Sequence, residues 1–178
     1  MDHLPIFAKL SNKQCLVVGG GDVAARKLAL LLDAGASVTV VAPSINMTIK
    51  DIDQASLTLI ETHYQHQHMR GMDLVIAATN DHQLNRTISI DAEKQHIFVN
   101  VVDDPDLCTF VMPAIVDRSP ITIAIGTGGA APVLARLLRG KIEALIPHSY
   151  GLLAGLAAKY RDRVKAVFHT GSSRKAFW

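Results

Sequence analysis

The sequence predicts an α/β fold built on a doubly wound parallel sheet, followed by a small α+β segment and a helical tail. Continuous apolar runs recur through the first 113 residues, as is typical of parallel strands covered on both faces. Segments with helical spacing separate these runs and would supply the crossover connections of such a sheet. After Pro113 the pattern changes to paired short strands and then helices, which predicts the smaller second part.

Five apolar runs are predicted as the parallel strands, at 14–19, 37–42, 57–61, 73–79 and 97–102. A helix is predicted over 22–33, because its apolar residues recur at helical spacing and Gly35 follows its end. A second helix is predicted from about residue 81 to residue 94.

Beyond Pro113, two short strands are predicted within 114–126, around the turn sequence Asp-Arg-Ser-Pro. A glycine-rich turn then leads into a helix within 127–146, with Pro132 in its first turn. The last predicted helix runs from 149 to about 169. It carries one apolar stripe, formed by Leu152, Leu153, Leu156, Tyr160, Val164 and Phe168.

This second part is too small to bury its own apolar surface, so we expect it to pack on a partner subunit. The expected division of the chain is 1–113 for the sheet domain, 114–147 for a dimerisation segment and 148–178 for a helical region.

Composition excludes several classes of protein. The 178 residues are 49% hydrophobic, with a net charge of +2, few aromatic residues and no Lys/Arg stripe, which argues against nucleic-acid binding. No signal peptide and no apolar run of membrane-spanning length is recognisable, so neither secretion nor a membrane is expected. Cys15 and Cys108 form no CxxC motif and are expected to be reduced thiols of a cytoplasmic protein. Lysine and arginine are concentrated late in the chain. These residues either form a solvated helical surface or attract an anionic ligand.

Gly19, Gly21 and Ala24 form a G-x-G-x-x-A pattern between the first strand and the first helix. The first glycine permits a tight turn, the second lets the backbone approach a pyrophosphate, and the small third residue lets helix and strand pack closely. The free N–H groups of the helix N-terminus would bind the phosphates. This context indicates a dinucleotide-binding turn, and a tight corner without a ligand is the alternative.

The second strand is followed by Pro43 and Ser44, where many dinucleotide sites keep an acid for the ribose. No arginine that would bind the 2′-phosphate of NADP stands there either. NAD is therefore favoured over NADP, with Ser44 and the backbone around Pro43 as candidate ribose contacts.

The fifth strand leads into Asn100, Asp103, Asp104 and Asp106. Ligands of open parallel sheets bind beyond the carboxyl ends of the strands, so a carboxylate here could act as a general base. The alternative is that these residues only form a turn. Asp103 is the better candidate because it is adjacent to the strand, whereas Asp104 and Asp106 are typical turn residues.

Two further motifs leave their interpretation open. Thr127 and Gly128 precede a helix and form either a second anion or substrate cradle or a plain helix entry. His63, His66 and His68 are clustered, but no cysteine or carboxylate set with zinc spacing accompanies them. A polar connection is favoured there over a metal site.

Several longer segments resemble the siroheme synthase family, in its module of precorrin-2 dehydrogenase and sirohydrochlorin ferrochelatase. The resemblance covers essentially the whole chain. It rests on the segments CLVVGGGDVAARK, AATND, NVVDDPDLCTFVMPAIVDRSPITIAI, TGGAAPVLARLLRGKIE and RKAFW. It implies a cytoplasmic homodimer with an NAD-binding Rossmann domain, a dimerisation segment and a small helical region.

The resemblance also implies two reactions at one cleft. Precorrin-2 would be oxidised to sirohydrochlorin with NAD as hydride acceptor, and Fe²⁺ would then be inserted as a second substrate to give siroheme. Asp103 would be the catalytic carboxylate for both reactions. The implied cofactor contacts are Gly21, Asp22 and Val23 on the glycine turn, with Pro43 and Ser44 after the second strand. The tetrapyrrole nitrogens would bind the iron, so no resident protein metal is implied.

The substrate carries many carboxylates, and candidate contacts for it are Asn100, Arg118, Thr127, Gly128 and Arg136. Thr127 stands where close fused relatives have serine. Some family members continue into a domain that methylates uroporphyrinogen III, and the present chain is expected not to methylate. Two alternatives stay open: a chelatase alone, with the sheet domain as scaffold, and a non-enzymatic NAD-sensing module.

Overall fold

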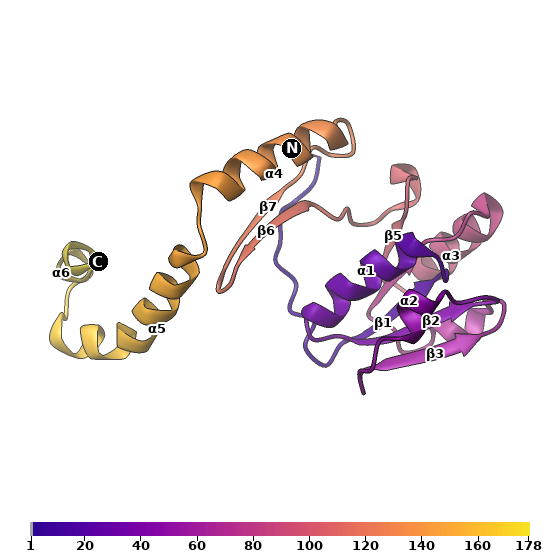
Figure 1. Ribbon diagram of the computed structural model, residues 1–178, viewed down its shortest axis with the longest axis horizontal. Helices are drawn as coiled ribbons and strands as arrows, with labels where there is room; N and C mark the ends of the chain where they lie inside the picture. The colour runs from indigo at the N-terminus through magenta and orange to yellow at the C-terminus, as the bar shows by residue number, and fades with distance from the viewer. Residues whose placement is uncertain (1) are drawn as a thin grey trace. The chain divides into compact units, whose positions relative to one another are not determined.

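The computed structural model describes residues 2–178, which divide into two compact units between Met112 and Pro113. The first unit is a five-stranded parallel sheet with the strand order β3-β2-β1-β4-β5 (Figure 1). Its strands are β1 (Gln14–Val18), β2 (Ser37–Ala42), β3 (Leu57–Glu61), β4 (Leu74–Ala77) and β5 (Phe98–Val101). The order reverses direction at β1, from which β2 and β3 lie on one side and β4 and β5 on the other. The predicted doubly wound sheet is thus confirmed.

Helices cover both faces of the sheet. Side chains on one face pack against α1 (Asp22–Asp33) and the short α2 (Met47–Lys50), and those on the other pack against α3 (His82–Lys94). In β1, Cys15 and Val17 belong to the first core, while Leu16 and Val18 belong to the second. Successive side chains of a strand point to opposite faces, so a strand covered on both faces must be apolar throughout. This explains the uninterrupted apolar runs.

The register of the sheet places four strand ends at one edge. Val18 of β1 pairs with Val41 of β2 and with Ala77 of β4, and Ala77 pairs in turn with Val101 of β5. The segments that follow these strands therefore emerge side by side. They include the glycine turn, the Pro43–Ser44 loop and the loop that carries Asp103. This carboxyl edge is where ligands of open α/β sheets bind.

The second unit consists of an antiparallel pair of strands and three helices. They are β6 (Ala114–Arg118), β7 (Ile121–Ile125), α4 (Pro132–Leu145), α5 (Ser149–Val167) and α6 (Gly171–Phe177). Few of its apolar side chains are buried, Val116, Ala135 and Val164 among them. Much of the stripe predicted on the last long helix is exposed, including Leu152 at 78% and Leu153 at 61%. The stripe thus finds little cover within its own chain.

Several boundaries differ from the sequence-based expectations. The strand predicted at 73–79 is shorter in the structure, where β4 has four residues and the Thr79 hydroxyl beyond it donates to the side chain of Asn85. The helix expected to reach about 169 ends at Val167. The helices α2 and α6 and the 3₁₀ turns η1 (His66–Met69) and η2 (Pro105–Leu107) were not predicted. These elements are too short to show periodicity in the sequence, and caps and tertiary contacts stabilise them.

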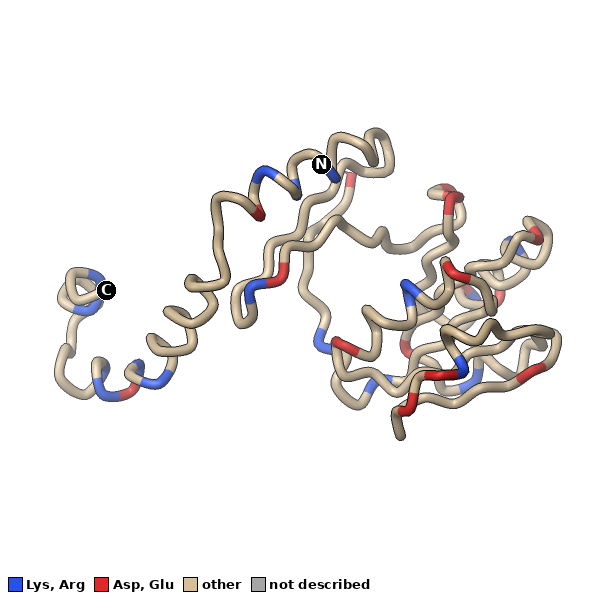
Figure 2. Tube along the Cα trace, viewed as in Figure 1, with Lys and Arg blue, Asp and Glu red and all other residues tan. Residues whose placement is uncertain are grey.

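Charge is distributed differently in the two units. Figure 2 shows acidic and basic residues interspersed over the first unit, whereas Lys and Arg predominate in α5 and α6. Within residues 2–178, no helix combines the length and the apolar character that crossing a membrane requires.

Candidate functional site

The glycine turn is wedged between two neighbouring loops. Gly19 has a φ of +131°, and a Cβ at this position would lie 2.3 Å from the carbonyl oxygen of Ala78, just after β4. A Cβ on Gly20 would lie 2.0 Å from the carbonyl oxygen of Ser44. The Asn46 N–H also donates to the Gly20 carbonyl at 2.9 Å. Only residues without a side chain can occupy these two positions without displacing backbone. The fingerprint assigns no role to Gly20, so the sequence pattern missed it.

Gly21 is different, because a Cβ there would meet no atom within 4 Å. Gly21 is the N-cap of α1 with extended backbone, φ −94° and ψ −171°, and no side chain caps this helix end. Asp22 and Val23 follow in the first turn, and Ala24 is fully buried against the sheet. Open space beside uncapped N–H groups fits the approach of a pyrophosphate. The residues present therefore fit a dinucleotide.

The loop after β2 carries Pro43 and Ser44, both exposed. Asn46 ties this loop to the glycine turn, since its side-chain N–H donates to the Asp22 carboxylate at 2.9 Å. The Asn46 side-chain oxygen accepts from the Ile49 N–H and so caps α2. The loop has no acid of its own, but Asn46 holds the α1 carboxylate of Asp22 beside it. Asn before a short apolar stretch is a helix-cap signal that could have indicated Asn46.

Asp103 lies in the turn that follows β5, two strands away from β1. Adjacent strands are about 4.8 Å apart, so the ends of β1 and β5 are separated by roughly 10 Å. Asp103 is exposed and has a φ of +60°, a left-handed conformation that Asp tolerates better than most residues. The side chain is therefore presented to solvent at the carboxyl edge.

Lys27 of α1 provides an electrostatic connection between the two sides of this edge. Burial lowers the pKa of Lys27, and the neighbouring Arg26 lowers it further. Electrostatic interactions with Asp103 and Cys108 act in the opposite direction and raise the pKa of Lys27. The Lys27 ammonium is thus within electrostatic reach of the Asp103 loop, and the sequence pattern did not indicate it.

Asn100 is buried in β5, at 7% exposure. Its side-chain N–H groups donate to the Phe110 carbonyl at 3.0 Å and contact the Cys108 sulfur at 3.5 Å. These contacts hold the segment that returns from the Asp103 turn.

The other predicted substrate contacts belong to the second unit. The Thr127 hydroxyl accepts from the Ala131 N–H at 3.4 Å, and Gly128 has a φ of +62° in the turn before α4. Arg136 is exposed on α4. The Arg118 guanidinium donates to the carbonyls of Ile146 and Glu143 at the end of α4 and to that of Asp117. Arg118 is therefore engaged as a cap of α4, because the last carbonyls of a helix lack partners within it.

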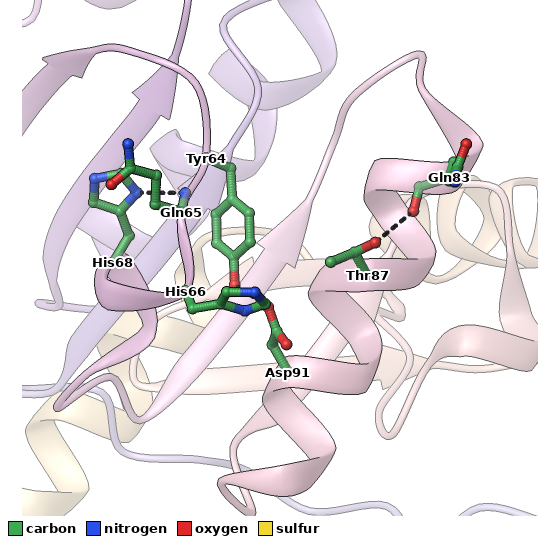
Figure 3. Close-up of polar contacts among 7 residues, drawn as sticks. All are labelled: Tyr64, Gln65, His66, His68, Gln83, Thr87 and Asp91. Carbon is green, nitrogen blue, oxygen red and sulfur yellow. Dashed lines mark hydrogen bonds and ion pairs between the residues drawn. The ribbon is translucent and has the colours of Figure 1, made fainter.

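The histidine cluster has a structural arrangement of its own (Figure 3). His66 contacts the buried carboxylate of Asp91 through Nδ1, and the Tyr64 hydroxyl donates to the same carboxylate at 2.9 Å. Burial raises the pKa of Tyr64, and the hydrogen bond to Asp91 raises it further. The His68 ring nitrogen accepts from the Gln65 N–H and caps the 3₁₀ turn. Among residues 2–178 there is no group of three His, Cys, Asp or Glu side chains that could hold a metal ion.

Three family models match consecutive parts of the chain. The first, described as putative NAD(P)-binding, matches residues 6–114. The second, described as the sirohaem biosynthesis protein central region, matches residues 118–145. The third, the sirohaem synthase dimerisation region, matches residues 149–178. The dimerisation description thus lies C-terminal to the segment 114–147 for which dimerisation was expected.

Similar proteins carry the name siroheme synthase. The chain is 51% identical over 179 residues to the one from Methylobacillus flagellatus and 49% identical over 180 residues to the one from Nitrosomonas europaea. Both alignments include 100% of this chain but only 38% of the relative. The chain therefore spans well under half the length of these relatives.

Among solved structures, "SirC, precorrin-2 dehydrogenase" matches 98% of this chain and 86% of its own, with a TM-score of 0.82 and 24% identity. The two proteins share the fold across both units. Taken with the family matches, these similarities show that the chain belongs to the putative NAD(P)-binding family and is homologous over its whole length to a part of the siroheme synthases.

Proposed function

We propose that this chain is an NAD-dependent dehydrogenase of siroheme biosynthesis, which oxidises precorrin-2 to sirohydrochlorin. One observation supports this most strongly: the open glycine turn and the Asp103 carboxylate lie at the same edge of one parallel sheet. A dinucleotide bound with its pyrophosphate at Gly21 would extend along this edge. The homology to siroheme synthases indicates the substrate class.

Each part of the proposed site has its own role in binding or in proton transfer. The uncapped first turn of α1, at Gly21, Asp22 and Val23, would bind the pyrophosphate, and Pro43 and Ser44 would contact the ribose. NAD, when bound, supplies a hydride acceptor. Oxidation of the macrocycle also releases a proton, which Asp103 accepts as general base. Because Asp103 is exposed, it can pass this proton to solvent.

We further propose that the same carboxylate serves the insertion of Fe²⁺ into sirohydrochlorin. Two pyrrole N–H protons must leave as the metal enters, and Asp103 can accept them in turn. The four ring nitrogens bind Fe²⁺, which is a substrate. Arg136, Thr127 and Gly128 remain candidate contacts for the carboxylates of the macrocycle, whereas the observed bonds of Arg118 favour a structural role for it.

We also propose that the chain acts as a homodimer that forms through the second unit. The dimerisation description matches α5 and α6, and the exposed apolar side chains of α5 need a cover. A monomer in sedimentation measurements at micromolar concentration would contradict this assignment.

The backbone conformation of Asp103 decides which variant tests it. Asp and Asn both tolerate a φ of +60°, whereas Ala is strained there, so Asp103→Asn removes the base without changing the turn. Asp106→Asn is the matched control, since Asp106 is exposed nearby in η2. The assay incubates the chain with precorrin-2 and NAD and follows sirohydrochlorin and NADH by absorbance.

We expect Asp103→Asn to lose about 100-fold or more in turnover, within the range for removal of a general base, while Asp106→Asn keeps it. Normal turnover of Asp103→Asn would refute the assignment of the base. Absence of NAD binding to the wild type, with iron insertion retained, would favour a chelatase on an inactive scaffold. NAD binding without either reaction would favour a sensor module.

A further inference from the structure

The turn that carries Asp103 is bracketed by a single thiol. The Cys108 sulfur accepts from the Val101 N–H at 3.1 Å, two residues before Asp103. The same sulfur is 3.2 Å from the Val101 carbonyl oxygen and 3.3 Å from the Asp104 carbonyl oxygen, one residue after Asp103. Both ends of the turn are therefore attached to one side chain.

We propose that Cys108 is a positioning residue that holds Asp103 in its reactive orientation. This inference rests on the proposed function for its effect on rate, but the anchoring itself is a property of the folded chain. Cys108 does not touch the reacting atoms and acts only through the turn.

The turn needs such an anchor because its own closure is weak. The residues from 101 to 104 form a four-residue turn, closed by a long hydrogen bond of 3.4 Å from the Asp104 N–H to the Val101 carbonyl. Its third residue, Asp103, has positive φ, the conformation that usually requires glycine or asparagine. A residue in this strained region stays there only when its surroundings hold it.

The chemistry of the thiol suits the task. Burial raises the pKa of Cys108, so the sulfur keeps its proton at neutral pH and has one hydrogen to donate. That hydrogen can reach the carbonyl of Val101 or of Asp104, while the sulfur accepts the Val101 N–H. Cys108 is itself fixed, since its N–H donates to the Pro105 carbonyl at 3.1 Å and Asn100 contacts its sulfur.

Two variants at position 108 test whether the hydrogen bonds of the side chain hold the turn, because alanine removes these bonds and serine can keep them. Cys108→Ala removes the sulfur and leaves the buried Val101 N–H without this partner. Cys108→Ser keeps a group that both donates and accepts. Cys15→Ala is the matched control, because Cys15 is the other free cysteine and belongs to β1, away from this turn.

The first measurement is amide hydrogen exchange on these variants of the 178-residue chain. We expect residues 101–107 of Cys108→Ala to exchange about tenfold faster or more than in the wild type, through local opening of the turn. Cys108→Ser should stay close to the wild type, and Cys15→Ala should leave this segment unchanged. Equal protection in Cys108→Ala and wild type would overturn the anchoring, whatever the activity of the chain.

The second measurement is sirohydrochlorin formation at saturating NAD. We expect kcat of Cys108→Ala to fall about 10- to 100-fold, as for a displaced catalytic group, while the Kd for NAD is unchanged because the glycine turn is intact. Cys108→Ser should restore most of kcat. A wild-type kcat in Cys108→Ala, or a Ser variant as slow as the Ala variant, would overturn the positioning role. Full turnover in Asp103→Asn would instead refute the proposed base and leave the exchange result to stand by itself.

Discussion

Variants at two adjacent glycines, Gly20 and Gly21, can separate the proposed cofactor role of the turn from its structural role. Gly20→Ala would place a Cβ 2.0 Å from the Ser44 carbonyl oxygen and 2.9 Å from the Ile45 Cα. Contacts of carbon with carbon or oxygen need a little over 3 Å, so the Ser44 loop must move by about 1 Å. The movement also stretches the hydrogen bond from Asn46 to Gly20.

The cost of this movement follows from known overpacking and hydrogen-bond values. Overpacking costs about 1–3 kcal/mol and the strained hydrogen bond about 1 kcal/mol, so Gly20→Ala should destabilise the chain by roughly 2–4 kcal/mol. The melting temperature should fall by about 6–12 °C, at about 3 °C per kcal/mol for a chain of this size. Differential scanning calorimetry measures this change directly.

Gly21→Ala should behave in the opposite way. Its backbone is extended and the space beside it is open, so only the weaker N-cap propensity of alanine acts against it, at about 0.5–1 kcal/mol. The new methyl group would occupy the space that a pyrophosphate needs. We expect the Kd for NAD, measured by calorimetric titration, to rise about 10- to 100-fold, equivalent to about 1.4–2.8 kcal/mol.

Either of two results for Gly20→Ala and Gly21→Ala would contradict these predictions. Unchanged NAD affinity in a folded Gly21→Ala would mean that no phosphate approaches this turn. A Gly20→Ala variant as stable as the wild type would mean that the contact with Ser44 is not close. Gly126→Ala, at an open position in the second unit, controls for the general effect of replacing glycine.

Three further predictions concern stability. Burial, with a smaller contribution from the charge of Asp73, raises the pKa of Cys15 to about 11. The folded state therefore keeps the thiol proton up to a higher pH than the unfolded chain does. The contribution of the protonated thiol to the free energy of unfolding is fully present below about pH 9 and is lost as the pH rises toward 11. The stability lost over this interval amounts to about 3 kcal/mol. In the Cys15→Ala variant, the urea midpoints at pH 8 and pH 10.5 should therefore differ less than in the wild type. Tyr64→Phe removes the hydroxyl that donates to the buried Asp91 carboxylate and should cost about 1.5–3 kcal/mol in urea unfolding, so an unchanged midpoint would contradict the role assigned to this bond. Arg118→Met removes the donors to the last carbonyls of α4 and should speed amide exchange in its last turn, whereas unchanged exchange there would rule out the capping role.

The sheet and its long helices could be predicted because their signals are local. Apolar runs buried on both faces, glycines after strands and helical spacing all appear in the sequence itself. Periodicity could not predict the short α2, since four residues are too few to show it, and the bond from Asn46 to Asp22 joins residues 24 positions apart.

The sequence could predict that the candidate residues lie at the carboxyl edge of the sheet, but it could not predict their contacts. The glycine pattern and the end of β5 indicated Gly21 and Asp103. The tight approach of Gly20 to Ser44 depends on how two loops meet, which no spacing rule encodes. The thiol of Cys108 gave no motif, because its partners are backbone groups of a turn whose left-handed residue the sequence does not reveal.

The contiguity of the sheet has a consequence for synthesis. All five strands lie between residues 14 and 101, and no strand of the second unit joins them. A ribosome adds about 5–20 residues per second, so the 66 residues from Pro113 to Trp178 take about 3–13 s to translate. Mixed α/β domains commonly fold within milliseconds to seconds. The nascent chain can therefore fold its first unit before the helices with uncovered apolar side chains have been made, which shortens the time during which both units are unfolded together.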